Sequence, residues 1–401
     1  CLINIKDYEG AISLLSNVYD LDDNNFDSKF YLGYSFYKLE NYNQAIKEFT
    51  QALLLSTNHP DTYYYLGNSY SMIGKKKQAL ESFIMAVNLD PYNGSAHFEL
   101  GKIYELVLKK KLALDHYKIA NKYIDSHELN YMYGLLLYDE QLYRKAIGPL
   151  RQFIIYEPDN IEILEILGEI FIKENRYPEA IDTYNRLIDK SPDSNLYYMN
   201  IADSYYELAN YSMSKIYYQK VLDLNEENAA ILLRLGSICN LLYEYDKAEE
   251  YLNESISCGY TSKDLLFELG IAYGGQKKYL SALISLKEAL TYSLDDPILH
   301  YQLGVIYQEM SIFDLAILEY QIYLNTYRSD PIAYRLIGNS YMNLNNYQDA
   351  IINYRKASEL FNHEDINTFY NLGKCYFFIE DFKNSTKYYK SIIRIEHNYP
   401  E

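Results

Sequence analysis

Tryptophan is absent from the 401-residue chain, and cysteine, proline and glycine are scarce. The four cysteines, Cys1, Cys239, Cys258 and Cys375, form no CxxC pair, so the sequence predicts neither a zinc site nor a disulfide framework. That usage favours a reducing compartment, and we expect the protein in the cytoplasm. No apolar run is long enough for a membrane span, because glutamates interrupt the most apolar segment, residues 161–172.

Positive charge is also in short supply. The chain has 37 Lys and Arg against 55 Asp and Glu, a net charge of −18. A nucleic-acid-binding protein needs a basic face, so this balance argues against nucleic acid and favours neutral or basic partners. The seven histidines show no metal-ligand spacing, and the sequence contains no phosphate-binding loop or nucleophile elbow. We therefore predict no metal, no cofactor and no catalytic centre.

Tyrosine, in contrast, is abundant, with 49 residues, and it follows a repeat. One small residue recurs at intervals of 34, 34, 33, 34, 34, 34, 34, 34, 34 and 35 residues. We call these positions the glycine column: Gly33, Gly67, Gly101, Gly134, Gly168, Ala202, Gly236, Gly270, Gly304, Gly338 and Gly373. Spacing this regular predicts a solenoid of one repeated unit.

Other residue types keep a fixed distance from the glycine column. Leucine precedes it by one residue, aromatic residues follow it by three, nine and sixteen, and alanine follows it by twelve. Residues four apart share one face of a helix, so each unit is predicted to be two helices joined by a polar turn. A small column residue would let two helix backbones approach, with the aromatic side chain of a neighbour filling the space beside it. Most tyrosines are thus predicted to be packing residues.

The pattern YYLG-x-x-Y … F-x-x-A … P in residues 64–91 closely resembles the tetratricopeptide repeat, and the resemblance extends over nearly the whole chain. It implies an all-α fold, a right-handed superhelical solenoid of antiparallel helix pairs. The first helix of each pair would line a concave face and the second a convex face. Departures are local: Ala202 replaces a glycine, and Ser214 and Ser385 replace the alanine.

The repeat also predicts the organisation of the chain. Residues 7–12, DYEGAI, match residues 41–46, NYNQAI, at an offset of 34. We therefore expect residues 1–25 to hold the second helix of a truncated leading repeat, and residues 26–401 to form eleven tandem repeats in one continuous solenoid. Two explanations fit a start inside a repeat, an excised fragment or a mature lipoprotein acylated at Cys1; the shortened first helix favours the fragment.

One face of each first helix is a candidate binding surface. Residues three before, one after and four after the glycine column share a face distinct from the leucine–tyrosine face, and the resemblance implies that it lines the concave groove. Its predicted partner-binding residues are Phe30, Tyr34, Tyr37, Tyr64, Asn68, Phe98, Lys102, Tyr131, Tyr138, Glu165, Glu169 and Asp203. An extended peptide with apolar anchors followed by a basic segment would match the aromatic and acidic parts. The alternative is that the aromatic rings only pack against neighbouring repeats.

A second candidate surface is basic. Six lysines occupy the same three columns of two consecutive repeats, and we call them the basic stripe: Lys75, Lys76, Lys77, Lys109, Lys110 and Lys111. Lys76 and Lys110 stand where most repeats have an aromatic residue. The stripe would suit an acidic partner or an anionic surface; the alternative is two solvated turns.

These features predict a non-catalytic scaffold that binds an extended peptide or partner segment in a concave groove. A rival interpretation is a regulatory or substrate-recruiting arm of a larger enzyme whose catalytic domain lies outside this sequence. A third is a structural protein that self-associates through its open ends.

Overall fold

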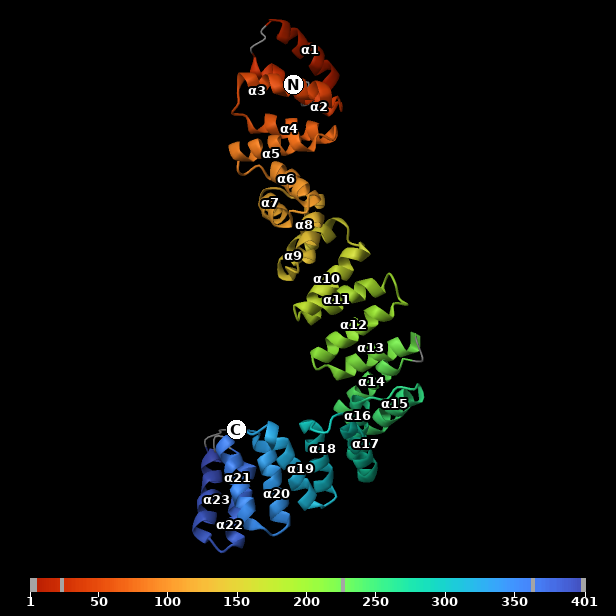
Figure 1. The fold of residues 1–401 in the computed structure, drawn as a ribbon, viewed down its shortest axis with the longest axis vertical. Helices are drawn as coiled ribbons and strands as arrows, with labels where there is room; N and C mark the ends of the chain where they lie inside the picture. The colour runs from red at the N-terminus through yellow and green to blue at the C-terminus, as the bar shows by residue number, and fades with distance from the viewer. Residues whose placement is uncertain (1–5, 22–24, 225–227, 362–364, 398–401) are drawn as a thin grey trace. The chain divides into compact units, whose positions relative to one another are not determined.

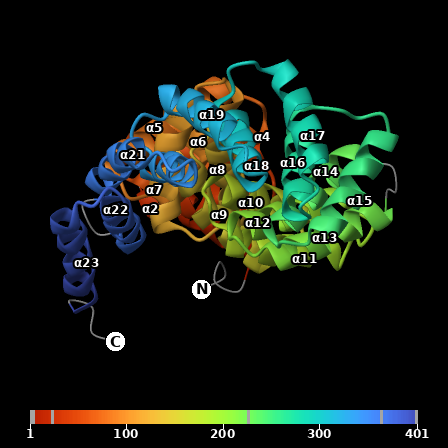
Figure 2. The same ribbon diagram turned by 90° about the horizontal axis from the view of Figure 1, so that it is seen from below.

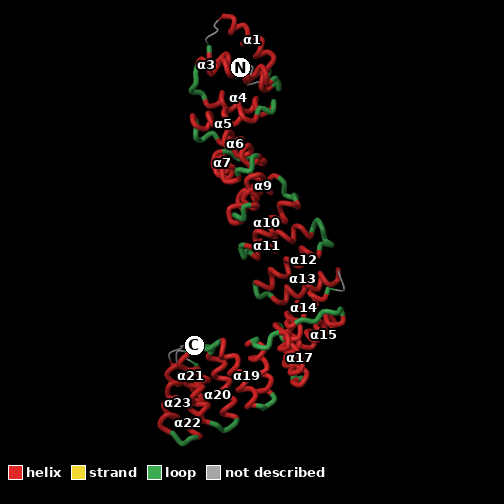
Figure 3. Tube along the Cα trace, in the orientation of Figure 1, coloured by secondary structure: helices red, strands yellow, loops and turns green. Residues whose placement is uncertain are grey.

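A computed structural model describes residues 6–21, 25–224, 228–361 and 365–397, so Cys1 and the other residues of 1–5 lie outside the described part. The predicted all-α class is confirmed. The described residues contain 23 helices and no strand, and short turns join the helices (Figures 1 and 3). None of these helices is long and apolar enough to cross a membrane.

The chain divides into two compact units, residues 1–189 and residues 190–401. The helices of the first unit follow one another in the order α1 (Tyr8–Leu21), α2 (Phe26–Lys38), α3 (Tyr42–Leu55), α4 (Pro60–Met72), α5 (Lys76–Leu89), α6 (Gly94–Leu106), α7 (Lys110–Tyr123), α8 (His127–Asp139), α9 (Tyr143–Tyr156), α10 (Ile161–Lys173) and α11 (Tyr177–Ile188). From α2 on, each even-numbered helix carries one member of the glycine column and is followed by the second helix of its repeat.

The second unit continues the same alternation, and neighbours such as α16 and α17 lie side by side in both views (Figures 1 and 2). Its helices are α12 (Asn195–Glu207), α13 (Tyr211–Leu224), α14 (Ala229–Leu241), α15 (Tyr245–Ser257), α16 (Lys263–Gly275), α17 (Tyr279–Tyr292), α18 (Pro297–Glu309), α19 (Phe313–Thr326), α20 (Pro331–Asn343), α21 (Tyr347–Leu360), α22 (Ile366–Phe378) and α23 (Phe382–His397).

The glycine column marks the closest approach within each helix pair. A Cβ atom added to Gly101 would lie 2.3 Å from the Tyr117 ring, and one added to Gly304 would lie 2.7 Å from the Tyr320 ring. At all ten column glycines the nearest atoms belong to the residue sixteen positions later, on the second helix of the same repeat. The small residue is therefore required by contact, since a larger side chain would overlap a ring or a leucine.

The serines that replace the alanine keep the packing and add a hydrogen bond. Ser214 Oγ donates to the backbone oxygen of Ala202, and Ser385 Oγ donates to that of Gly373, both at 2.9 Å. Each hydroxyl is buried and satisfied by the first helix of its own repeat, so the substitution leaves no unpaired polar group.

The three aromatic columns differ in burial. Tyr117, Tyr218, Tyr320 and Tyr354, sixteen after the column, are fully buried. The rings three and nine after it are mostly half-buried, and Phe382, in the latter column, is 57 % exposed. The three columns therefore pack to different depths, and the column sixteen after the glycine column is the most enclosed. The residue nine after the column lies at the start of the second helix, at the edge of a stack only two helices thick.

The turn inside each repeat has one backbone form. The residue seven after the column has positive φ in all eleven repeats, including Leu108 at 59° and Ser311 at 61°. In the Leu108 turn, the Leu108 amide donates to the Glu105 carbonyl and the Lys109 amide donates to the Tyr104 carbonyl, both at 2.9 Å. This left-handed cap ends the first helix and satisfies its last carbonyls, and only Gly74 places a glycine there.

Candidate partner-binding surfaces

The aromatic part of the predicted face is gathered around a residue that the sequence did not single out. Phe30, Tyr34 and Tyr37 of α2 are half-buried, and each ring packs on Tyr65 of α4, with centroid distances of 6.3, 5.0 and 5.5 Å. Lys38 Nζ lies 5.3 Å from the Tyr34 ring centre and 5.7 Å from that of Tyr37. The rings therefore form one joined aromatic surface that bridges two consecutive repeats.

Two hydroxyl groups of this surface, those of Tyr37 and Tyr65, have raised pKa values and are neutral at physiological pH. Burial, followed by the neighbouring Tyr64, raises the pKa of Tyr37 to about 12. Burial also raises the pKa of Tyr65, and the nearby Tyr34 adds to the effect. The contacts between these rings agree with the alternative in which the aromatic residues pack against neighbouring repeats. The rings are only half-buried, however, so part of their surface is still available to a partner.

The middle of the predicted face is more closed. Tyr64 and Asn68 are half-buried on α4, and Tyr64 packs on Phe83 at 6.1 Å. Phe98 is only 6 % exposed, and Lys102 Nζ covers its ring at 4.6 Å. We predicted Phe98 as part of an open binding face, but its burial makes it a core residue.

Lys102 itself has carboxylate partners. Its Nζ lies 2.8 Å from Glu99 Oε1 and 3.5 Å from Glu128 Oε1. Burial opposes the charge on Lys102, but the hydrogen bonds and charges of the two glutamates outweigh it, so the pKa of Lys102 is raised. The lysine thus joins α6 to α8 as a paired cation.

The aromatic and acidic parts of the face meet between α8 and α10. Tyr131 packs on Phe153 at 5.1 Å, and Tyr138 Oη donates to Glu169 Oε2 at 2.6 Å. That hydrogen bond to a carboxylate is the main reason why the pKa of Tyr138 is raised to about 12. Glu169 also pairs with Lys173 Nζ at 2.6 Å.

The remaining acidic residues are divided between the two units. Glu165 is exposed in the first unit, one turn before Glu169 on α10. Asp203 is exposed in the second unit and accepts a hydrogen bond from Tyr218 Oη. Within the first unit, the structure therefore joins Phe30, Tyr34 and Tyr37 through Tyr65 and, separately, Tyr138 with Glu169.

The basic stripe is exposed, except that Lys110 is half-buried. Lys110 Nζ lies 2.8 Å from Glu140 Oε1, and it is the only member with a carboxylate partner among the described residues. Lys75 Nζ lies 6.0 Å from the Tyr70 ring centre. Because Glu140 belongs to the turn of the next repeat, the Lys110–Glu140 pair shows that consecutive turns lie side by side.

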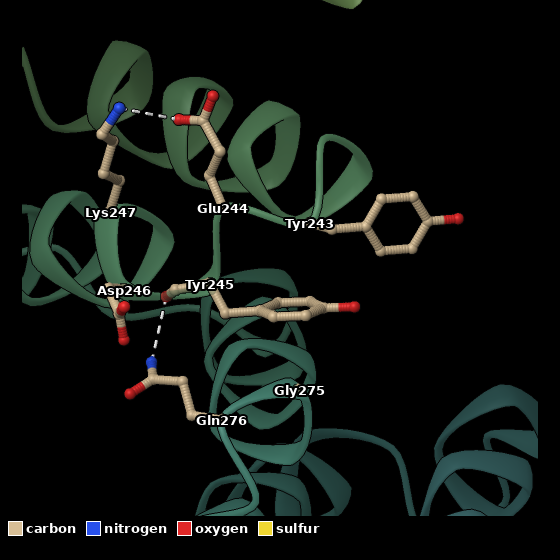
Figure 4. A pocket seen from close by; sticks show the side chains of 7 residues that line it. All are labelled: Tyr243, Glu244, Tyr245, Asp246, Lys247, Gly275 and Gln276. Atoms are coloured by element: carbon tan, nitrogen blue, oxygen red, sulfur yellow. Dashed lines mark hydrogen bonds and ion pairs between the residues drawn. The ribbon is translucent and has the colours of Figure 1, made fainter.

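An open hollow of about 500 Å³ lies at one turn of the second unit (Figure 4). Glu244 pairs with Lys247 at 3.1 Å, and Gln276 Nε2 donates to the Tyr245 carbonyl at 3.0 Å. The Tyr245 ring packs over Gly275, where an added Cβ would lie 2.5 Å from it. The hollow was not predicted, and its polar groups mainly tie two repeats to each other.

Two histidines that are far apart in the sequence meet inside one repeat. His97 Nδ1 of α6 lies 2.8 Å from His116 Nδ1 of α7. Their positions, four before and fifteen after the glycine column, recur in His300 and Glu319, whose Nδ1 and Oε2 atoms lie 2.6 Å apart. Aligning the sequence on its repeat would have found both pairs. Across the described residues, no three His, Cys, Asp or Glu side chains gather as a metal site would need.

Comparison with protein families matches five stretches of the chain. Residues 4–86 match the family of anaphase-promoting complex, cyclosome, subunit 3. Residues 131–195, 197–228, 333–363 and 366–399 match tetratricopeptide repeat families. No curated protein shows a significant match to the chain.

Several solved structures are similar in fold. The APC/C hetero-tetramer Cut9–Hcn1 is 14 % identical, with 99 % of this chain and 92 % of that chain covered and a TM-score of 0.45. The P58(IPK) TPR domain is 17 % identical, with 89 % and 98 % covered and a TM-score of 0.40. MamA from Desulfovibrio magneticus RS-1 is 20 % identical, with 43 % and 97 % covered and a TM-score of 0.41.

Proposed function

The chain is a tetratricopeptide-repeat protein, and we propose that it is a non-catalytic scaffold that holds an extended segment of a partner protein against the first helices of residues 1–189. The observation that carries the proposal is the aromatic surface of Phe30, Tyr34 and Tyr37 around Tyr65. Repeat packing alone does not require large rings at these three column positions, and joined half-exposed rings are typical of partner sites.

The chemistry of the surface indicates the partner segment. The aromatic rings of α2 and α4 would take apolar or aromatic anchors, while Lys38 disfavours a basic residue beside Tyr34 and Tyr37. Glu165 and Glu169 follow on α10 and would attract lysine or arginine. We therefore propose a segment that carries apolar anchors first and basic residues later.

A peptide library displayed on phage, with the 401-residue chain as bait, tests this proposal. We expect selected peptides to contain aromatic or leucine anchors and to lose about tenfold or more in affinity for a Tyr34→Ala/Tyr37→Ala variant, because central aromatic residues carry most binding energy at such sites. Glu165→Gln/Glu169→Gln should weaken only peptides with a basic segment, and more so at low salt.

Tyr206→Ala is the matched control, because Tyr206 occupies the column of Tyr37 in the second unit. It packs on Tyr211 at 5.4 Å as Tyr37 packs on Tyr42 at 5.9 Å. Selected peptides that bind the Tyr34→Ala/Tyr37→Ala variant as tightly as the unmodified chain would contradict the proposed site.

The match of residues 4–86 to a subunit of the anaphase-promoting complex favours a second candidate, a non-catalytic subunit of a larger enzyme assembly. Native purification of the chain from its own cells would separate the two candidates. A stoichiometric complex that survives high salt supports the assembly subunit, whereas exchangeable partners support the peptide-binding scaffold.

A further inference from the structure

The turn between α6 and α7 exposes consecutive apolar side chains. Leu106, Val107 and Leu108 are each more than half exposed, and Leu108 reaches 82 %. Leu112, one helical turn further, and Met72, in the preceding turn, are exposed as well. Single exposed apolar residues are ordinary on a protein surface, but three in sequence at one tip are characteristic of an interaction site.

The backbone at this tip makes leucine an unfavourable choice. Leu108 adopts the left-handed conformation, with φ at 59°, which costs a residue with a Cβ atom about 1 kcal/mol. Gly74 relieves the same strain in the preceding turn. Ten of the eleven repeats hold a residue other than glycine in this conformation, so the strain belongs to the turn itself. What marks Leu108 is a large apolar side chain that stays exposed.

The basic stripe next to this tip is also unfavourable for the fold. Lys75 and Lys109 are the N-cap residues of α5 and α7, and neither side chain makes a capping hydrogen bond. The first turns of both helices contain no acidic residue, although the positive end of a helix dipole favours one. Acidic residues outnumber basic ones by 18 in the chain, yet within the part that the structure describes only Lys110 of the stripe has a carboxylate partner.

The Lys110–Glu140 pair places the Leu108 turn beside the next turn of the chain. From the repeat we infer that the preceding turn, with Met72 and Lys75–Lys77, lies on the other side of the Leu108 tip. We propose that this edge docks onto an anionic lipid surface, with Leu106, Val107 and Leu108 entering the headgroup region and the basic stripe contacting lipid phosphates. The proposal is independent of the peptide site proposed above.

The arrangement fits a lipid surface better than an acidic peptide. The apolar side chains stand on the tip of a turn, where they could enter a bilayer interface but could not enclose a peptide side chain. Each lysine near an anionic membrane contributes about 1 kcal/mol, and this attraction acts over a screening length of about 8 Å. At this edge Glu140 pairs with Lys110, so the attraction would come mainly from the other five lysines of the stripe, while acidic residues beyond the screening length contribute little.

The second unit contains a natural counterpart of the tip. Leu241 and Tyr243 are exposed at the equivalent turn, and the Tyr243 ring extends to the same side as the Tyr245 ring, with 6.2 Å between the ring centres (Figure 4). Tyr243 has the same positive φ as Leu108, but Glu244 follows it where Lys109 follows Leu108. The Tyr243 turn therefore has the same backbone conformation and an exposed apolar tip like the Leu108 turn, but the residue that follows the tip is acidic instead of basic.

Co-sedimentation of the 401-residue chain with vesicles tests the proposal. We expect binding to phosphatidylcholine vesicles with about 30 % phosphatidylserine at low salt, and none to pure phosphatidylcholine. Lys109→Glu/Lys111→Glu should reduce the bound fraction about tenfold, and Leu106→Ser/Leu108→Asn about fivefold. Both pairs are exposed, so the melting temperature should change little.

Two control variants complete the experiment. Leu241→Ser/Tyr243→Asn removes the tip of the acidic turn, and Lys383→Glu/Lys387→Glu reverses two exposed lysines of the second unit; both should bind as the unmodified chain does. Absence of binding to the anionic vesicles overturns the proposal and leaves an acidic protein segment as the partner of the stripe. Full binding by the Leu106→Ser/Leu108→Asn variant overturns it too, because only a charge contact would remain.

Discussion

Two repeats of the chain share one framework and differ in a buried polar pair. In the repeat of Gly101 (α6 and α7) and in the repeat of Gly304 (α18 and α19), a histidine stands four residues before the glycine. The Nε2 atom of His97 lies 3.2 Å from the Pro91 carbonyl oxygen, and that of His300 lies 3.1 Å from the Leu294 carbonyl oxygen. The backbone therefore fixes the same ring nitrogen in both repeats.

The difference is the group that faces the other nitrogen. His97 Nδ1 meets His116 Nδ1 at 2.8 Å, whereas His300 Nδ1 meets Glu319 Oε2 at 2.6 Å. With Nε2–H donated to a carbonyl, His97 Nδ1 accepts a hydrogen bond from the Nδ1–H group of His116. Both nitrogens of His300 face oxygen atoms, one of the Leu294 carbonyl and one of the Glu319 carboxylate.

The two repeats also differ in which buried side chain has a carboxylate partner. Tyr117 Oη donates to Glu105 Oε2 at 2.6 Å, but Tyr320 Oη donates to Gln308 Oε1 at 3.2 Å. In the Gly101 repeat the carboxylate accepts a hydrogen bond from the buried tyrosine, whereas in the Gly304 repeat the carboxylate contacts the buried histidine. Both repeats keep the contact between the column glycine and the aromatic ring, so this contact determines the fold. The polar residues four before and fifteen after the glycine differ, and they can make the stability of each repeat depend differently on pH.

The shared part of the comparison predicts the largest effect. Gly101→Leu and Gly304→Leu should each lower the free energy of unfolding by about 3 kcal/mol or more, because the new Cβ would overlap the fully buried ring of Tyr117 or Tyr320. Urea unfolding followed by circular dichroism would measure both losses.

Tyr301→Leu is the control for this prediction. Tyr301 is half-buried and packs on Tyr320 and Tyr323 at 5.7 and 5.0 Å, so its replacement removes contacts without forcing helices apart. We expect a loss of about 1–2 kcal/mol. Equal losses for Gly304→Leu and Tyr301→Leu would show that the close contact does not limit the packing.

The helix pairs could be predicted from the sequence because their causes are local and repeated. Gly101, Ala113 and Tyr117 sit at fixed offsets, and each offset corresponds to one contact between the two helices of a repeat. The left-handed turn residue could not be predicted in this way, since Leu108 and Ser311 share a backbone form but no chemical property. There the hydrogen bonds that end the helix override the preference of the side chain.

The candidate surface was less predictable than the fold. Tyr65 could not be identified as the centre of the aromatic surface, because that depends on how consecutive first helices cross. Phe98 has the column position of Tyr64 yet is buried, since Lys102 lies over its ring. The pairs of His97 with His116 and of His300 with Glu319 could have been predicted, because their column positions recur.

The His97–His116 pair, which the Gly304 repeat lacks, predicts a smaller change in the free energy of unfolding that depends on pH. Burial lowers the pKa of His97, and burial together with the nearby His97 lowers the pKa of His116 from 6.5 to about 4, although Asp90 and Asp115 oppose these shifts. Between pH 6.5 and pH 4 the unfolded chain therefore binds protons that the folded pair does not. Stability should be complete above pH 6.5 and fall as the pH falls, by about 1–2 kcal/mol at pH 5, since His116 is only half-buried.

Hydrogen exchange of α6 and α7 at pH 7.5 and pH 5 would measure this loss, corrected for the intrinsic exchange rate at each pH. His116→Glu gives His97 the partner that His300 has, so the loss at pH 5 should disappear. Glu319→His should introduce a similar loss into α18 and α19. If His116→Glu is as sensitive to pH as the unmodified chain, the histidine pair is not the origin of the effect.

The smallest effect concerns the turn that both repeats share. Leu108→Gly and Ser311→Gly should each stabilise the protein by about 0.5 kcal/mol. Glycine removes the clash of a Cβ atom at positive φ, which is worth about 1 kcal/mol, but it also increases the conformational entropy of the unfolded chain. Thermal unfolding of the two variants would show the gain as a small rise in Tm.

Gly74→Ala reverses this change at the same turn position and should cost about 1 kcal/mol, since its φ of 76° does not suit a residue with a Cβ atom. No heavy atom lies within 4 Å of the Cβ that alanine would add, so the cost would come from the backbone and not from packing. A rise in Tm for Gly74→Ala would mean that the turn can leave the left-handed conformation. The same freedom would then extend to Leu108, and the gain expected for Leu108→Gly would vanish.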